Sequence, residues 1–259
     1  MDSVRSQNHR FSPGKWVRAM EDRFRFSIPP RPEGTPVSDD ELERILRASV
    51  AEHPEGSKEH RDALWQLTRF LGLTGRQAEG LEILDALLDS AVEPEERAEL
   101  TLAMGQLMER LGDYRSAIAA YSRGVALEPV GEATWYLLHN NLGYCLNQFG
   151  RHVEAEHWCR AAIQIDPLRH NAHKNLGLAC QGQGRYVEAA RSFIQALHCE
   201  AGDPRALRHL GDLVEAHPEI VTEMPNIQGE LESCSMAVEA AKLVRKEQFF
   251  GKPSEPQSN

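Results

Sequence analysis

The sequence has no run of eighteen apolar residues, so it offers no candidate for a membrane-spanning helix. It has five cysteines but no C-x-x-C pair, and it has no P-loop, dinucleotide fingerprint or nucleophile elbow. Unpaired cysteines in a chain without a secretory signal fit free thiols in a reducing compartment, so we expect a cytoplasmic location. Together these absences predict a chain that is not an enzyme and that binds neither a metal nor a cofactor.

Acidic residues outnumber basic residues in this chain. The net charge is −10 over 259 residues, and this balance argues against nucleic acid as a partner. Apolar residues make up 41% of the chain and aromatic residues 7%, which is ordinary for a globular protein. A chain of this length can bury a sizeable core, so we expect a folded globular protein.

One seventeen-residue phrase occurs twice. HNNLGYCLNQFGRHVEA fills residues 139–155, and HKNLGLACQGQGRYVEA fills residues 173–189, 34 residues later. The second glycine of the phrase separates two stretches with apolar residues at i, i+3, i+4 and i+7. Equivalent glycines stand at Gly75, Gly112, Gly150 and Gly184. This pattern predicts a series of αα-hairpins, each with a glycine in its turn.

Small and large residues recur at fixed places in these hairpins. The first helices carry Gly105, Gly143 and Gly177, and the second helices carry Tyr121, Cys159 and Phe193. Glycine in a helix interior costs about 1 kcal/mol relative to alanine, so its repetition indicates a close helix contact. We therefore expect small residues of one helix to face large residues of the next.

The Leu-Gly pairs at 142–143, 176–177 and 210–211, with the recurring small and bulky positions, resemble the tetratricopeptide repeat. The resemblance implies an all-α fold, a right-handed solenoid of about four to five helix-turn-helix repeats over residues 57–218. It also implies a non-enzymatic role in protein–protein interaction. The pattern departs from the family at Thr68, where glycine is usual, and at Pro218 and Pro225, which interrupt the fifth repeat.

The flanking segments differ from the repeats. Residues 1–36 form a basic, proline-rich arm and linker, and residues 251–259 read as a disordered tail. Ser38 with Glu41 forms a capping box that begins an N-terminal capping helix within residues 37–56. Residues 219–250 are expected to hold a C-terminal capping helix. In the arm, Trp16, Met20 and Phe24 form an apolar stripe that either docks on the solenoid or binds a partner.

The resemblance places the binding site on the concave groove, which first helices line at fixed repeat positions. An amide side chain both donates and accepts hydrogen bonds, which suits the backbone of an extended peptide. Lysine and arginine nearby suit an acidic side chain or a free C-terminal carboxylate. The candidate peptide-binding residues are Asn140, Asn141, Tyr144, Asn147, Lys174, Asn175, Gln181, Arg205, Arg208 and His209.

Two other interpretations stay open. The chain could be an assembly or regulatory subunit that uses its N-terminal arm and convex face, or it could be similar to the carboxylate-clamp co-chaperones. Those co-chaperones need lysine and asparagine in a set order across three repeats, and Asn140, Lys174 and Arg205 supply the residue types in a different order. Neither the partner nor the oligomeric state follows from the sequence.

Overall fold

The computed structural model describes residues 38–250, with side chains to residue 244, and every regular element in this range is an α-helix. This confirms the predicted all-α class. The chain divides into two compact units, residues 1–96 and residues 97–259, and each is described by itself. The boundary falls in the first turn of α5 (Pro94–Arg110). The apolar stripe predicted for the N-terminal arm lies outside the described residues.

The first unit contains α2 (Asp39–Glu52), α3 (Lys58–Leu73) and α4 (Gln77–Ser90). The Ser38 side chain accepts a hydrogen bond of 3.2 Å from the backbone N–H of Glu41, so Ser38 is the N-cap of α2. Leu46 of α2 is buried against a small apolar cluster on α3. The N-terminal capping helix is therefore held to the first repeat by apolar packing.

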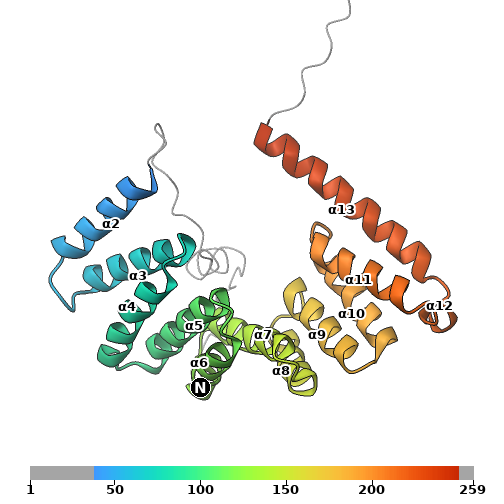
Figure 1. Ribbon diagram of the computed structural model, residues 1–259, viewed down its shortest axis with the longest axis horizontal. Helices are drawn as coiled ribbons and strands as arrows, with labels where there is room; N and C mark the ends of the chain where they lie inside the picture. The colour runs from blue at the N-terminus through green and yellow to red at the C-terminus, as the bar shows by residue number, and fades with distance from the viewer. Residues whose placement is uncertain (1–37, 251–259) are drawn as a thin grey trace, which may run out of the picture. The chain divides into compact units, whose positions relative to one another are not determined.

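The second unit carries the rest of α5 and the remaining helices. Figure 1 shows successive helices running antiparallel to one another in pairs, such as α7 with α8 and α9 with α10. The remaining elements are α6 (Tyr114–Ala126), α7 (Glu132–Gln148), α8 (His152–Ile165), α9 (His170–Gly182), α10 (Tyr186–Cys199), α11 (Pro204–Ala216), α12 (Ile220–Glu223) and α13 (Ile227–Phe250).

The turn glycines have the conformation that the repeat pattern requires. Gly75, Gly112, Gly150 and Gly184 have φ between +75° and +86°, in the left-handed region that residues with a Cβ rarely adopt. At Gly150 the chain closes the turn with a hydrogen bond of 2.9 Å from the Arg151 N–H to the Leu146 carbonyl. The predicted helix–glycine turn–helix units are confirmed.

The small and large residues meet as predicted. A Cβ built on Gly177 would lie 2.5 Å from a ring carbon of Phe193, and one on Gly143 would lie 2.6 Å from the Cys159 sulfur. Gly105 is covered in the same way by Tyr121. A Cβ built on Gly211 would meet nothing within 4 Å, and here the short helix α12 follows α11 in place of a full second helix. These glycines let facing helices approach closely.

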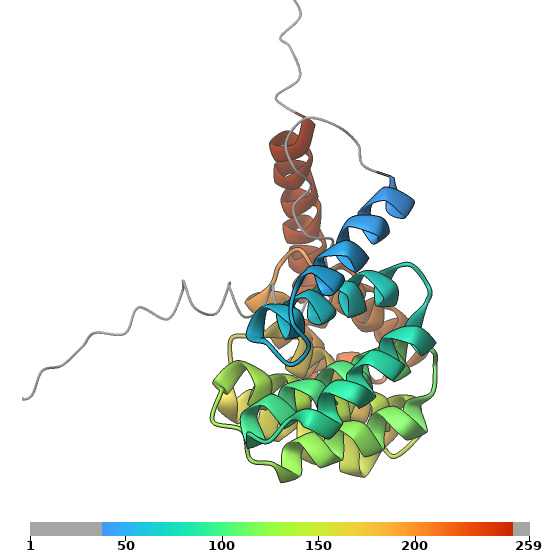
Figure 2. The same ribbon diagram turned by 90° about the vertical axis from the view of Figure 1, so that its left-hand side faces the viewer.

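The C-terminal cap is longer than the repeat helices. Helix α13 has 24 residues, and Figure 2 shows it as one continuous helix. Cys234 and Val238 of its first half are buried, whereas Leu243 and Val244 are exposed. None of the described helices, α13 included, combines the length and the apolar character needed to cross a bilayer.

Candidate functional site

The candidate site begins with a row of asparagines on α7 and α9. The Asn140 side-chain N–H donates to Asn141 Oδ1 at 2.9 Å, and the Asn175 side-chain N–H donates to Asn140 Oδ1 at 3.1 Å. The Asn147 side chain donates at 2.8 Å to the backbone carbonyl of Asn175. Asn175 is only 2% exposed. These amides therefore join the third repeat to the fourth.

The row continues toward α5 through a tyrosine. The Asn141 side chain donates to the Tyr121 hydroxyl at 3.4 Å, and this hydroxyl donates to Glu109 Oε2 at 3.0 Å. Burial raises the pKa of the Glu109 carboxyl, and the Tyr121 hydrogen bond and the Arg110 charge oppose this shift. Burial also raises the pKa of Tyr121 well above its ordinary value, so this hydroxyl stays protonated as a donor. The result is a buried polar chain across three repeats.

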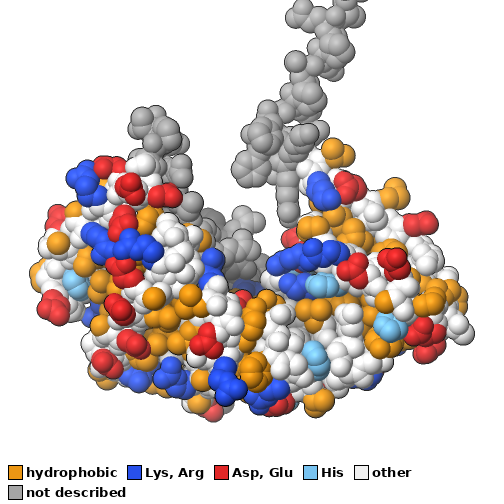
Figure 3. Space-filling view, in the orientation of Figure 1, with side chains coloured by type: hydrophobic (Ala, Val, Ile, Leu, Met, Phe, Trp, Pro, Cys, Tyr) orange, Lys and Arg blue, Asp and Glu red, His pale blue; other side chains and the backbone are white. Residues whose placement is uncertain are grey.

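Cationic side chains gather at the other end of the row, on α9 and α11. Lys174 is buried, and its ammonium group donates to Asn171 Oδ1 at 3.3 Å. Arg205 donates to the same oxygen at 3.4 Å and also pairs with Asp203 at 3.0 Å. We call Lys174, Arg205, Arg208 and His209 the cationic cluster. Figure 3 shows Lys and Arg side chains beside a histidine over the same part of the molecule.

The pKa values in the cationic cluster reflect burial first and the neighbouring positive charges second. Burial, followed by the Arg205 charge, lowers the pKa of Lys174 to about 8. Burial, followed by the charges of Arg208 and Lys174, lowers the pKa of His209. Asp203 and other carboxylates oppose these shifts without cancelling them. Arg208 is exposed and forms no ion pair with any residue that the structure describes. The cluster therefore has positive charge available for an anionic ligand.

The predicted residues thus separate into two groups. Asn140, Asn147, Lys174 and Asn175 are buried and hydrogen-bonded, although exposed groove residues were expected at these positions. The reason is that adjacent repeats pack closely enough for amides of α7 and α9 to hydrogen-bond one another. The Asn175 Oδ1 atom is buried without a partner among the described residues. Other predicted residues keep an accessible surface; these are Asn141, Tyr144, Gln181, Arg205, Arg208 and His209.

Two participants were missed by sequence reasoning. Asp203, the residue before Pro204, caps α11 by accepting from the Arg205 N–H at 3.0 Å, and an Asp-Pro pair is a helix-start signal that points to this role. No sequence signal points to Glu109, since its role depends on the hydrogen bond from Tyr121 of the following helix, α6.

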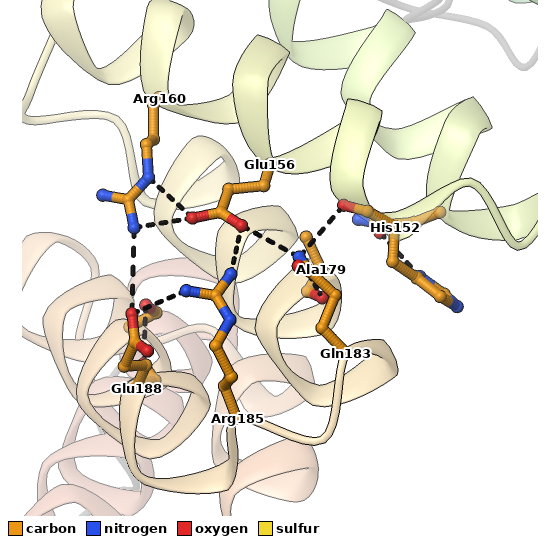
Figure 4. Close-up of polar contacts among 9 residues, drawn as sticks. His152, Glu156, Arg160, Ala179, Gln183, Arg185 and Glu188 are labelled. Atoms are coloured by element: carbon orange, nitrogen blue, oxygen red, sulfur yellow. Dashed lines mark hydrogen bonds and ion pairs between the residues drawn. The ribbon is translucent and has the colours of Figure 1, made fainter.

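A separate surface feature lies on α8 and α10. Glu156 accepts hydrogen bonds from Arg160 at 2.9 Å and from Gln183 at 2.9 Å, and it also pairs with Arg185 (Figure 4). Arg185 in turn donates to Glu188 at 2.9 Å. Because these charges neutralise one another, the network ties α8 to α10 and offers little to a charged ligand. A hollow of about 350 Å³ beside it is lined by charges of both signs, among them Arg191 and Glu219.

Comparison with known proteins agrees with this architecture. A tetratricopeptide repeat model matches residues 102–170. Residues 102–170 carry the tetratricopeptide repeat pattern. Tetratricopeptide repeat protein 7B of Homo sapiens is 32% identical over 100 residues, which are 39% of this chain and 11% of that protein. Small glutamine-rich tetratricopeptide repeat-containing protein 2 of Mycosarcoma maydis is 31% identical over 104 residues, 40% of this chain and 28% of that protein. The chain therefore spans less than a third of either relative.

Solved structures match over a larger part of the chain. BtubC from P. vanneervenii has a TM-score of 0.64 at 15% identity, covering 86% of this chain and 97% of that one. The MamA RS-1 ArsTM double mutant has a TM-score of 0.55 at 16% identity, covering 79% and 99%. At these identities the likeness shows the fold alone, and it confirms the predicted tetratricopeptide solenoid. Such repeats are protein-interaction scaffolds.

Proposed function

We propose that the repeats bind an extended peptide of a partner protein, and that the cationic cluster holds an acidic side chain or the C-terminal carboxylate of this peptide. The observation that carries the proposal is the exposed Arg208, which has no ion pair with any described residue. It stands directly before His209 in α11, and after burial its positive charge is the next cause that lowers the pKa of His209. An anion would offset this positive charge, and charge-assisted hydrogen bonds are among the strong ones in proteins.

The asparagines have two roles in this proposal. Asn140, Asn147 and Asn175 are buried, and they fix the spacing of α7 and α9 beneath the site. Asn141 and Gln181 remain accessible, so their amides are the groups that would contact the peptide backbone. The tetratricopeptide fold supports a peptide as the ligand, because its repeats present first helices side by side along an extended surface.

The test is a selection from a random peptide library that presents both internal sequences and free C-termini. We expect the wild-type chain to enrich peptides with Asp, Glu or a terminal carboxylate. Arg208→Glu should weaken binding of the selected peptides by about tenfold or more, since it replaces an attractive contact with a repulsive one. Arg191→Glu is the matched control, because Arg191 is an exposed arginine on α10, outside the cationic cluster.

Amidated versions of the selected peptides separate two variants of the proposal. Loss of binding on amidation identifies a terminal carboxylate as the anion, as in a carboxylate clamp. Retained binding identifies an internal acidic side chain. Selection of peptides without acidic groups, or binding that survives Arg208→Glu unchanged, would overturn the proposal. The N-terminal arm and the convex face would then be tested by deletion of residues 1–36.

A further inference from the structure

Three potential metal ligands meet where α13 packs on α10. His198 lies in the last turn of α10, while Glu230 and Cys234 lie four residues apart on α13. One ligand atom from each of the three side chains lies within 4.8 Å of the others. The His198 Nε2 and Glu230 Oε2 atoms are 4.0 Å apart. Residues at i and i+4 share one helix face, so α13 presents both of its ligands to α10.

The separation between His198 and Glu230 is near the one that a tetrahedral ion requires, and the Cys234 sulfur lies within 4.8 Å of both ligand atoms. Zinc bonds are about 2.0–2.1 Å to nitrogen, about 2.0–2.2 Å to oxygen and about 2.3 Å to sulfur. A tetrahedral angle then places nitrogen and oxygen ligands about 3.4 Å apart. The observed 4.0 Å between His198 and Glu230 needs only a small rotamer adjustment, and both side chains are more than 40% exposed and free to make it. Cys234 is buried, and it provides a fixed point of the site.

We propose that His198, Glu230 and Cys234 bind a zinc ion that fastens the C-terminal helix α13 to α10. The mixed nitrogen, oxygen and sulfur donor set suits zinc, whereas magnesium and calcium take oxygen ligands. The three side chains leave one coordination position for water. Burial and the nearby Glu230 charge raise the pKa of Cys234, so zinc would displace a proton from this thiol when it binds.

This site is independent of the proposed peptide site, and the spacing rules used on the sequence could not find it. Those rules look for ligands that are close together along the chain, such as C-x-x-C. Here His198 stands on α10 and the other two ligands on α13, with α11 and α12 between them. Only the packing of the cap on the last complete repeat brings them together.

The test uses the full chain without an affinity tag, treated with a chelator and then titrated with CoCl₂ or ZnCl₂. Cobalt reports on the site directly, because a thiolate ligand gives a charge-transfer band in the near ultraviolet and four-coordinate cobalt gives intense visible bands. We expect both signals to saturate at one ion per chain, and zinc to displace the cobalt.

Variants decide which side chains are responsible. His198→Gln and Cys234→Ser should each weaken metal binding by at least about 100-fold, since losing even an outer partner of a ligand costs about 10–100-fold. Cys199→Ser is the matched control, because Cys199 neighbours His198 but is not one of the three ligands. His198 is exposed, so its variant keeps the proposal testable if Cys234→Ser does not fold. Failure of the wild type to bind either ion stoichiometrically, or a charge-transfer band that persists in Cys234→Ser, would overturn it.

Discussion

The polar residues of α7 and α9 differ from those of α11 in one respect that matters for function. The amides of Asn140 and Asn175 meet across the packed repeats, where the Asn175 side-chain N–H donates to Asn140 Oδ1 at 3.1 Å. Arg208 of α11 is exposed and has no ion pair among the described residues. Residues of similar polarity therefore have different roles. Those with partners in the next repeat stabilise the solenoid, and those without remain available to a ligand.

The two helices differ because they occupy different places in the repeat array. Helix α9 lies between α7 on one side and α10 on the other, so its inner residues meet a neighbour. Helix α11 belongs to an incomplete repeat, in which the four-residue α12 replaces a full second helix. Arg205, at the start of α11, pairs with Asp203, whereas Arg208, one turn later, has no ion pair among the described residues.

Phe193→Ala should have the largest effect, because Phe193 touches both regions. Its ring fills the space above Gly177 and stacks on His209 with a centroid distance of 5.5 Å. Removing a fully buried phenylalanine costs about 3–5 kcal/mol of the free energy of unfolding. Urea titration followed by circular dichroism measures this change, and Leu168→Ala at an exposed position is the control. A loss no greater than that of the control would contradict the assigned contact.

Asn175→Ala should affect the buried row alone. The change removes the donor to Asn140 Oδ1 and leaves that buried oxygen without its partner, which costs about 1–3 kcal/mol. The same urea titration detects the loss. Asn171→Ala offers a comparison, since Asn171 is the less buried asparagine of the same helix. Equal stability of Asn175→Ala and the wild type would show that the row does not hold the repeats together.

These two predictions rest on features that differ in how far the sequence revealed them. The 34-residue phrase predicted the turn glycines, and the small–large alternation predicted that Gly177 faces Phe193; both are confirmed. The same pattern named Asn140 and Asn175 as groove residues but could not say that they pair with each other. Repeat periodicity gives the side of the helix on which a residue lies, whereas burial depends on how closely the next helix approaches. That distance is set by side chains far away in the sequence.

The affinity for an acidic peptide should also depend on pH. Lys174 has a pKa of about 8, so it loses its charge in a range where the arginines keep theirs. Affinity for an acidic peptide should therefore fall a few-fold as the pH rises through this range.

The same lysine makes stability depend on pH. Between pH 8 and the ordinary lysine pKa of 10.5, the native chain binds fewer protons than the unfolded chain, so the free energy of unfolding rises with pH there. Lys174→Met should remove both the pH dependence of affinity and that of stability. Fluorescence anisotropy at several pH values measures the first, and urea titration at the same pH values measures the second; persistence of either in Lys174→Met would contradict the role given to this lysine.

The smallest effect is expected in the first unit. Glu43, Arg47, Arg76 and Glu79 form a ring of exposed ion pairs that joins α2 to α4, with Arg76 donating to Glu43 at 2.6 Å. Solvent screens such pairs, so Glu79→Gln should change the free energy of unfolding by no more than about 0.5 kcal/mol. Its peptide affinity should equal that of the wild type. A loss as large as that of Asn175→Ala would mean that exposed pairing stabilises this protein as strongly as the buried row does.

The most direct test measures the affinity of one selected acidic peptide for Arg208→Glu and for Asn175→Ala under conditions where both variants are folded. If α11 binds the ligand and α9 supports the fold, Arg208→Glu should lose about tenfold or more in affinity and keep its stability. Asn175→Ala should lose stability and keep its affinity within about threefold, since its amide lies beneath the site. Unchanged affinity in Arg208→Glu, or a loss of affinity in folded Asn175→Ala as large as tenfold, would contradict the account.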